Sequence, residues 1–376
     1  MNDDRGYFDF VVPTKVKFGP GMRSEIAREI ESRDFRSIGI VATKEIVELG
    51  LLDDIEAELK EIGRRVEIFA GVTGNPHLST VSDCYRRFAK FSPDCLVGFG
   101  GGSAIDVTKA AALCLANDET DLVNLNDREE VEPAAPYFAV PTTSGTGSEV
   151  DYWAVISDPE TKSKLSIGRP EMSPLTAVID PELTLTLPPE LTYYTGLDAF
   201  SHALEAYFSS ESNELSDVLA RKSMELVFES LETAVNRGED LSARGDMALA
   251  SSLGGAAMQH VGLGLIHAMS HQVSGFYDTN HGLANSLLML PVLEFNEKTV
   301  PDKVKDLENY LGGGLTDKVE ELFEIRDISK DRVRIKEDDL SEMVERAATN
   351  VNAETNPRPA DRDEIERLYR ESFTVV

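Results

Sequence analysis

Four short apolar segments, separated by stretches long enough for helices, dominate the first half of the 376-residue chain. Each has the composition of a buried β-strand. Strands that alternate with helix-length connections form parallel sheets, because only a long crossover returns the chain to the start of the next parallel strand. The predicted strands are Ser37–Thr43, 65–70, Cys95–Gly100 and 137–143, with a predicted helix at Leu78–Phe91 between the second and the third.

The second half of the chain has few such segments. After Pro188 and Pro189 helical periodicity prevails, interrupted by breaks such as LGGGL at 311–315. This change predicts an α/β domain with a Rossmann-like parallel sheet at 1–188 and an all-α domain at 189–376. No low-complexity linker separates them, so we expect close packing and an active site in the cleft between the domains. The predicted helices of the second domain are 191–209, 213–236, 243–274, 282–297 and 338–349.

The charge balance argues against several classes of partner. The chain has 67 acidic and 37 basic residues, a formal net charge of -30, and the acidic residues are spread along its length. Such a surface repels nucleic acids and anionic membranes, and no stretch reaches the roughly 20 apolar residues that cross a bilayer. At molar salt the Debye length falls to about 3 Å and the repulsion is screened, so we predict a halophilic protein.

The cysteines and the N-terminus bear on the compartment. Cys84, Cys95 and Cys114 show no CxxC spacing, and their odd number argues against a disulfide framework. The first ten residues lack the basic start and apolar run of a signal peptide. Both observations favour the reducing cytoplasm.

Two loops that follow predicted strands favour nucleotide binding. GGGSAID at 100–106 precedes a helical stretch, so its glycines would allow the backbone to approach a phosphate at a helix N-terminus. It is not the GxGxxG fingerprint, and a tight strand-to-helix turn is the alternative. PTTSGTGSE at 141–149 offers hydroxyls at the end of another strand. Two such loops at the carboxyl ends of strands of one sheet favour a dinucleotide site.

The histidines form a second pattern. Asp198 and His202 are four residues apart in the helical stretch GLDAFSHALEAY, so both side chains lie on one helix face. His267 and His271 have the same spacing, and His281 follows a short polar turn. One carboxylate and several imidazoles are typical of a divalent transition-metal site, such as Fe(II) or Zn(II); unconnected histidines are the alternative. The spacing does not decide which of His267, His271 and His281 bind.

Taken together, these motifs resemble the iron-containing alcohol dehydrogenase family. GLDAFSHALEAY and GLGLIHAMSHQVSGFYDTNHGLANSLLMLPVLEFN resemble its metal-binding half, and FGGGSAIDVTKA, PTTSGTGSEV and VIDPELTLTLPPELT resemble its cofactor half, in the same order. The resemblance is clear from about residue 7 to residue 300 and looser beyond. It implies a dehydroquinate-synthase-like two-domain fold and a metal-dependent oxidoreductase that transfers hydride between an alcohol and NAD(P). It also implies a homodimer or a larger homo-oligomer.

The resemblance also assigns roles to residues. It places the metal ligands at Asp198, His202, His267 and His281, which suit Fe(II) and also accept Zn(II) or Mn(II). His271 matches a histidine beside the metal that does not bind it, and is the candidate for relaying a proton. The implied cofactor-binding residues are Gly101, Gly102, Ser103, Thr142, Thr143, Ser148, Lys164 and Leu183.

One departure from the family concerns the choice of cofactor. Relatives that prefer NAD carry an aspartate at the position of Thr43, where a carboxylate accepts hydrogen bonds from the ribose 2′-hydroxyl and repels a 2′-phosphate. Here Thr43 is neutral and Lys44 adds a positive charge, although Glu45 lies close by. We therefore predict that the protein accepts NADP(H) and prefers it to NAD(H).

Several other residues have two interpretations. Tyr193 and Tyr194 stand where small residues are usual in the family, and either narrow the substrate pocket or pack between the domains. Trp153 either lines the pocket or packs beneath it. His77 and His260 are isolated in the pattern, and we predict structural roles for both.

Other functions within the same superfamily remain as alternatives. They are a zinc-dependent glycerol or polyol dehydrogenase, a dehydroquinate-synthase-like lyase, a metal-free maleylacetate-type reductase and a hydroxyacid–oxoacid transhydrogenase. The intact set of four implied ligands argues against a metal-free enzyme and against a regulatory protein that has lost its chemistry. The sequence leaves the transhydrogenase open.

Overall fold

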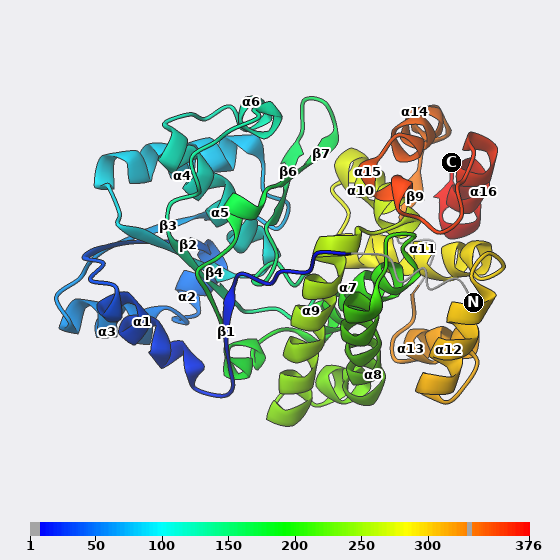
Figure 1. The fold of residues 1–376 in the computed structure, drawn as a ribbon, viewed down its shortest axis with the longest axis horizontal. Helices are drawn as coiled ribbons and strands as arrows, with labels where there is room; N and C mark the ends of the chain where they lie inside the picture. The colour runs from blue at the N-terminus through cyan, green and yellow to red at the C-terminus, as the bar shows by residue number, and fades with distance from the viewer. Residues whose placement is uncertain (1–7, 329–332) are drawn as a thin grey trace.

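The computed structural model describes residues 8–328 and 333–376. Residues 1–7, which hold most of the N-terminal stretch considered for a signal peptide, and residues 329–332 lie outside the described residues. Figure 1 shows an α/β region, formed by the first half of the chain, beside a helical region formed by the second half. The predicted fold class is therefore confirmed.

The α/β region is built on a six-stranded sheet in which every pairing is parallel, with the order β1-β8-β5-β4-β2-β3. All four predicted strands are present in it. The two additional strands, β1 and β8, are only four residues long, too short to show a clear pattern in the sequence. The six strands are β1 (Lys15–Phe18), β2 (Ser37–Thr43), β3 (Arg65–Val72), β4 (Cys95–Gly100), β5 (Tyr137–Pro141) and β8 (Thr176–Ile179).

Helices cover both faces of this sheet (Figure 1). Side chains alternate between the faces of a strand, so Ile38 and Ile40 of β2 pack against α1 and α3, whereas Val41 belongs to the core beneath α4 and α5. The covering helices are α1 (Glu25–Ser32), α3 (Asp53–Glu61), α4 (Leu78–Phe91) and α5 (Gly102–Asn117). Short connections are α2 (Lys44–Glu48), α6 (Leu122–Asp127) and the 3-10 helices η1 (Met22–Ser24), η2 (Pro170–Met172) and η3 (Pro181–Thr184).

An antiparallel hairpin that the sequence did not predict projects from the α/β region toward the helical region (Figure 1). It consists of β6 (Trp153–Asp158) and β7 (Ser163–Gly168). β7 packs against helix α10 (Leu265–Tyr277), and Arg346 Nη1 donates a hydrogen bond to the carbonyl oxygen of Thr161 at 2.8 Å. The hairpin therefore carries residues of the first half into the junction with the second.

The helical region is centred on three long helices that pack against one another, α7, α8 and α9. One large hydrophobic core joins them to the remaining helices. The helices are α7 (Pro189–Phe208), α8 (Glu214–Asn236), α9 (Leu241–Val261), α10, α11 (His281–Asn296), α12 (Pro301–Leu311), α13 (Leu315–Glu324), α14 (Glu337–Ala348), α15 (Val351–Glu354) and α16 (Arg362–Ser372). Two-residue strands β9 (Arg334–Ile335) and β10 (Thr374–Val375) pair in parallel.

One predicted helix was wrong in its extent. The segment 243–274 was predicted as a single helix, but α9 ends at Val261 and α10 begins at Leu265. Gly262 has a φ of 72°, in the left-handed region that glycine adopts easily, and this conformation ends α9. The apolar periodicity continues across the break, which explains why the sequence pattern did not reveal it.

Candidate metal and cofactor site

Helix α7 supplies two of the four predicted metal ligands. Asp198 and His202 are one turn apart and buried, in a helix whose neighbours are mostly apolar. A polar side chain buried in such surroundings is unfavourable unless it finds partners. Both side chains face the same point, where His267 of α10 and His281 of α11 also lie.

The other two predicted ligands come from the starts of two helices. His267 lies in the first turn of α10, directly after the glycine-containing break, and His281 is the first residue of α11. Asp278 ends α10 in the left-handed conformation. The side chain of Asn280 then accepts a hydrogen bond from Leu283 N at 3.1 Å and so begins α11. The turn between the helices thus brings His281 back toward His267, with ring centroids 5.2 Å apart.

Asp198, His202, His267 and His281 form one compact cluster. Each offers one ligand atom, and these atoms all lie within 4.8 Å of one another. Burial lowers the pKa values of His267 and His281 well below the usual range, so both rings are neutral and have a lone pair for a metal. One carboxylate and three imidazoles, at this separation, fit a divalent transition metal.

Hydrogen bonds from outside the cluster orient three of the four predicted ligands. His267 Nδ1 lies 2.5 Å from Glu205 Oε2, and His202 Nδ1 lies 3.2 Å from the carbonyl oxygen of Gly145. Asn285 Nδ2 donates to Asp198 Oδ1 at 2.7 Å. Glu205 and Asn285 were not predicted from the sequence. The sequence feature that could have identified them is their helical spacing, because Glu205 follows His202 by three residues and Asn285 follows His281 by four.

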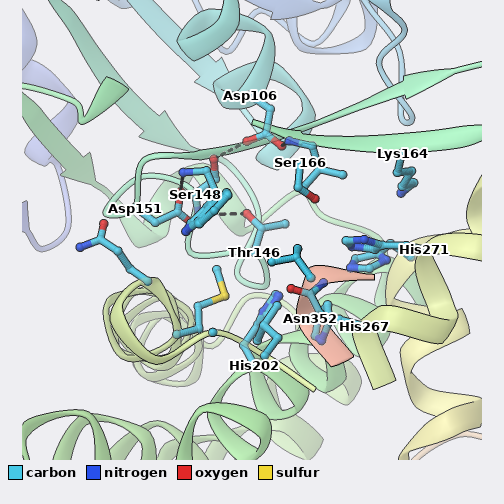
Figure 2. A pocket seen from close by; sticks show the side chains of 18 of the residues that line it. Asp106, Thr146, Ser148, Asp151, Lys164, Ser166, His202, His267, His271 and Asn352 are labelled. Carbon is cyan, nitrogen blue, oxygen red and sulfur yellow. Dashed lines mark hydrogen bonds between the residues drawn. The ribbon is translucent and has the colours of Figure 1, made fainter. Parts of the chain in front are cut away.

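His271 lies beside the cluster and does not join it. Its ring centroid is 6.1 Å from that of His267 and 5.3 Å from that of His281, and it lines the adjoining cavity (Figure 2). Its Nδ1 is buried without a hydrogen-bond partner, and burial lowers the pKa of the ring well below its usual value. The geometry therefore separates His271 from the three other histidines, a choice that the spacing left open.

A cavity of about 400 Å³ joins the two regions of the chain. Figure 2 shows Asp106, Thr146, Ser148 and Lys164 of the α/β region around it, opposite His202, His267 and His271 of the helical region. The expected cleft between the two regions is present. The remaining lining residues include Ser103, Asp151, Trp153, Met258, His260 and His281.

The two predicted phosphate loops pack against each other at the carboxyl edge of the sheet. A Cβ atom at Gly101 would lie 3.1 Å from Thr143 Oγ1, and one at Gly102 would lie 2.6 Å from Thr146 Cγ2. Glycine is therefore needed for the contact between the loops as well as for the approach of a ligand. Thr142 is buried beside them. Ser103 lines the cavity and donates a hydrogen bond to the carbonyl oxygen of Gly74 at 2.6 Å.

Ser148 belongs to a buried polar network that the sequence analysis did not predict. It donates to Asp106 Oδ1 at 2.6 Å and accepts from Lys109 Nζ at 2.8 Å. Lys109 is fully buried and also reaches Asp151 Oδ1 at 2.5 Å. Burial raises the pKa of the Asp106 carboxyl to about 6, with Lys109 acting in the opposite direction. The Ser148 side chain is thus fixed at the cavity wall with its hydrogen-bonding capacity already engaged.

The remaining predicted cofactor residues are dispersed. Lys164 of β7 lines the cavity with its Nζ 3.5 Å from Asn75 Oδ1, and burial lowers the pKa of its ammonium to about 8. Thr43 lies at the carboxyl end of β2, next to β4, and accepts a hydrogen bond from Ile46 N at 3.4 Å as the cap of α2. The side chain of Leu183 is buried in the apolar core beneath the sheet, away from the cavity lining.

The residues with two interpretations are placed as follows. Tyr193 is buried within the core of the helical region, and its hydroxyl donates to Leu322 O at 3.0 Å; Tyr194 packs beside it. Neither ring lines the cavity, so they do not narrow the pocket. Trp153 does line it. His260 lines the cavity too, and its Nε2 lies 2.7 Å from the carbonyl oxygen of Val11, a contact that ties the N-terminal segment to α9.

Comparisons with known proteins cover nearly the whole chain. A family model described as iron-containing alcohol dehydrogenase matches residues 13–181, and one described as the C-terminal part of the Fe-containing alcohol dehydrogenase family matches residues 192–373. The chain is 34% identical to alcohol dehydrogenase 4 of Schizosaccharomyces pombe, over 97% of this chain and 89% of that protein.

Solved structures agree with these matches. A crystal structure of 1,3-propanediol oxidoreductase superposes with a TM-score of 0.92 at 33% identity, covering 98% of this chain and 100% of that one. An archaeal halo-thermophilic alcohol dehydrogenase from a Red Sea brine pool superposes with a TM-score of 0.91 at 28% identity, with the same coverage of both chains.

Proposed function

The chain belongs to the iron-containing alcohol dehydrogenase family and is a metal-dependent oxidoreductase that interconverts alcohols and aldehydes, and we propose that it uses NAD(P)(H) as hydride carrier and Fe(II) as its native metal. One observation carries the proposal: the four-ligand cluster and the glycine loop at the start of α5 open on the same cavity. A metal and a nucleotide that bind there would meet within it.

The proposed metal ligands are Asp198, His202, His267 and His281, and Zn(II) or Mn(II) would fit the same donors. A divalent cation in this cluster supplies Lewis acidity to an alcohol or carbonyl oxygen, and a nicotinamide accepts or returns hydride at the substrate carbon. We propose that His271 moves the proton between the substrate oxygen and solvent. Its position at the cavity wall, with its ring 5.3 Å from that of His281, supports this role.

We propose that the nucleotide lies along the carboxyl edge of the sheet. The pyrophosphate would lie at Gly101, Gly102 and Ser103, where the N-terminus of the 16-residue helix α5 presents free N–H groups. Thr142, Thr143 and Ser148 would form the second wall, and Lys164 would lie near the nicotinamide. Leu183 would contribute through its backbone, because its side chain belongs to the core. The neutral Thr43 at the end of β2 supports a preference for NADP(H) over NAD(H).

The substrate is proposed to be a short primary alcohol or diol and the corresponding aldehyde. The similarity to 1,3-propanediol oxidoreductase supports this size class. The cavity of about 400 Å³ must also accommodate the nicotinamide, and Trp153 narrows it from the α/β side. These features leave little room for a large substrate.

One experiment tests the proposal. Protein purified without oxygen is stripped of metal, reloaded with Fe(II), Zn(II) or Mn(II), and assayed on short alcohols, diols and aldehydes with NAD⁺, NADP⁺ and their reduced forms. We expect metal-dependent turnover that requires added cofactor. Turnover without metal would contradict the proposed cluster. Exchange between a hydroxyacid and an oxoacid without added cofactor would identify a transhydrogenase instead.

Further proposals concern the protein as a whole. We propose adaptation to high salt, supported by the net charge of -30 and by the similarity to a halo-thermophilic enzyme.

We propose a homodimer or larger homo-oligomer, supported by exposed apolar side chains such as Val16 and Phe18 on the edge strand β1. Light scattering tests the oligomeric state. The domain boundary is proposed at 188/189, where α7 begins.

The proposed compartment is the cytoplasm, supported by three buried cysteines that are all free. Among the described residues, no helix has the length and apolar character to cross a membrane. The proposed partners are limited to small-molecule alcohols and aldehydes, the cofactor and further copies of the chain. Neither nucleic acid nor membrane is proposed as a partner, because the net charge is strongly negative.

A further inference from the structure

Helix α7 presents a third polar side chain to the metal cluster. Glu205 follows Asp198 by seven residues and His202 by three, so all three share one helix face. Only 4% of its side chain is exposed. A carboxylate buried this deeply is unfavourable unless several donors satisfy it. No lysine or arginine among the described residues is ion-paired with it, so its partners have to be other groups.

Two donors on α10 satisfy the carboxylate. Ile266 N donates to Oε1 at 2.6 Å, and His267 Nδ1 lies 2.5 Å from Oε2. Gly264 makes this approach possible, because a Cβ atom there would lie 2.7 Å from Oε1. Glu205 therefore contacts the first turn of α10 and the imidazole in that turn at the same time.

The contacts on the other side of the ring agree with a single tautomer. His267 Nε2 faces the cluster and lies 3.1 Å from Asn285 Nδ2, an amide nitrogen that can only donate. The carboxylate oxygen 2.5 Å from Nδ1 accepts a hydrogen bond, so the ring proton lies on Nδ1 and Nε2 is the unprotonated nitrogen. This arrangement leaves the lone pair of Nε2 directed into the cluster.

We propose that Glu205 is a positioning residue of the metal centre, which fixes the tautomer and the orientation of His267 and so raises the affinity of the cluster for a divalent cation. The proposal rests on the metal-binding function of the four-residue cluster proposed above. In other metal sites, a carboxylate that accepts a hydrogen bond from the ring N–H on the far side of a metal-bound histidine acts in this way. Loss of such a carboxylate lowers metal affinity roughly 10- to 100-fold. A bound cation would also balance the buried carboxylate through the ring.

The test measures metal affinity directly. Wild-type protein and Glu205→Gln are equilibrated with Co(II) against a competing chelator, and the visible absorption of bound Co(II) is recorded. The glutamine has nearly the same volume, but it replaces one of the two carboxyl oxygens with an amide nitrogen, which donates toward groups that themselves donate. We expect one Co(II) per wild-type chain and a roughly 10- to 100-fold weaker affinity in the variant, with a changed absorption spectrum.

A matched control separates positioning from the stability of the helix. Asn356 Oδ1 accepts from Leu265 N at 3.2 Å, so it contacts the same first turn of α10 without touching His267. Asn356→Ala should lower the thermal stability and leave the Co(II) affinity and spectrum unchanged.

Three results would overturn the inference. If Glu205→Gln binds Co(II) as tightly as the wild type, the positioning role is wrong and the proposed metal function stands. If Asn356→Ala weakens Co(II) binding as much as Glu205→Gln does, Glu205 acts only through helix stability. If the wild-type protein binds no Co(II), the metal function itself fails, and the role of Glu205 fails with it.

Discussion

Lys109 Nζ, fully buried in the α/β region, lies 2.8 Å from Ser148 Oγ in the loop at 141–149. The lysine extends from helix α5 and also reaches Asp151, two residues beyond that loop, at 2.5 Å. A single buried ammonium therefore joins the helix after the first glycine loop to the second loop.

Replacing Lys109 should destabilise the protein strongly. Lys109→Met keeps the apolar length of the side chain but leaves Asp151 and Asp106 without their buried counter-charge. Removing one partner of a buried ion pair lowers the free energy of unfolding by about 3–5 kcal/mol. Denaturant unfolding at constant high salt measures this loss. Lys90→Met, at an exposed site on α4, is the control and should change it by less than about 0.5 kcal/mol.

Metal and activity should be lost together when a ligand is removed. His267→Ala and His281→Ala each take away one of four donors, so we expect bound metal to fall to a few per cent of one equivalent and alcohol oxidation to fall with it. Metal analysis and turnover are measured on the same preparations. His271→Ala should retain metal but lose turnover, and His77→Ala should retain both. Full metal occupancy in His267→Ala would contradict the ligand assignment.

The glycine loop should control cofactor affinity. A Cβ atom at Gly102 would lie 2.6 Å from Thr146 Cγ2, so Gly102→Val must displace the second loop as well as obstruct the pyrophosphate. We expect the KM for the cofactor to rise by about 10-fold or more, with normal metal content. Gly245→Ala on α9, where the nearest atom is 3.8 Å from the added Cβ, should leave the KM unchanged. An unaltered cofactor KM in Gly102→Val would show that the loop is only a structural turn.

Replacing Thr43 with aspartate should reverse the preference for NADP(H) over NAD(H). Aspartate caps a helix as well as threonine does, so Thr43→Asp should preserve α2 while adding a carboxylate that repels a 2′-phosphate. We expect the wild type to favour NADP(H) and the variant to favour NAD(H), scored as the ratio of the two kcat/KM values. Strong wild-type selectivity for NAD(H), or an unchanged ratio, would show that Thr43 does not contact the ribose.

Salt should stabilise the protein by screening its own charge. With a net charge of -30, self-repulsion extends over a Debye length of about 10 Å at 0.1 M salt and about 3 Å at 1 M. We therefore expect the urea midpoint to fall and activity to disappear on dialysis into dilute buffer. Sucrose at equal osmolarity is the control, because it is excluded from the protein surface but does not screen charge. Full activity in dilute buffer would argue against halophilic adaptation.

The sequence predicted the parts of the structure that depend on local pattern. The four long strands and the helix Leu78–Phe91 have periodicities that no neighbouring segment alters. The cluster of Asp198 with three histidines was visible because ligands on helices recur at short spacings. Even so, the spacing could not exclude His271, since the turn before His281 decides which rings converge.

Features that depend on distant partners were missed. Glu205 and Lys109 lie in mostly apolar helices, and only contacts with distant residues explain them. The partners of Glu205 are 61 and 62 positions away in the sequence, and those of Lys109 are 39 and 42 positions away. The end of α9 at Gly262 was hidden because apolar residues continue on both sides of the break. Tyr193 could not be placed because its hydrogen-bond acceptor, the Leu322 carbonyl, lies 129 positions further on.

The hydrogen bond between His202 and the Gly145 carbonyl connects the two halves of the site through one peptide group. Gly145 belongs to the loop at 141–149 that is proposed to hold the nucleotide, whereas His202 is a proposed metal ligand. Any change in metal affinity caused by the nucleotide must therefore be matched by an equal change in nucleotide affinity caused by the metal, because linked binding free energies are reciprocal. The free concentration of either ligand then sets how much of the other the protein retains.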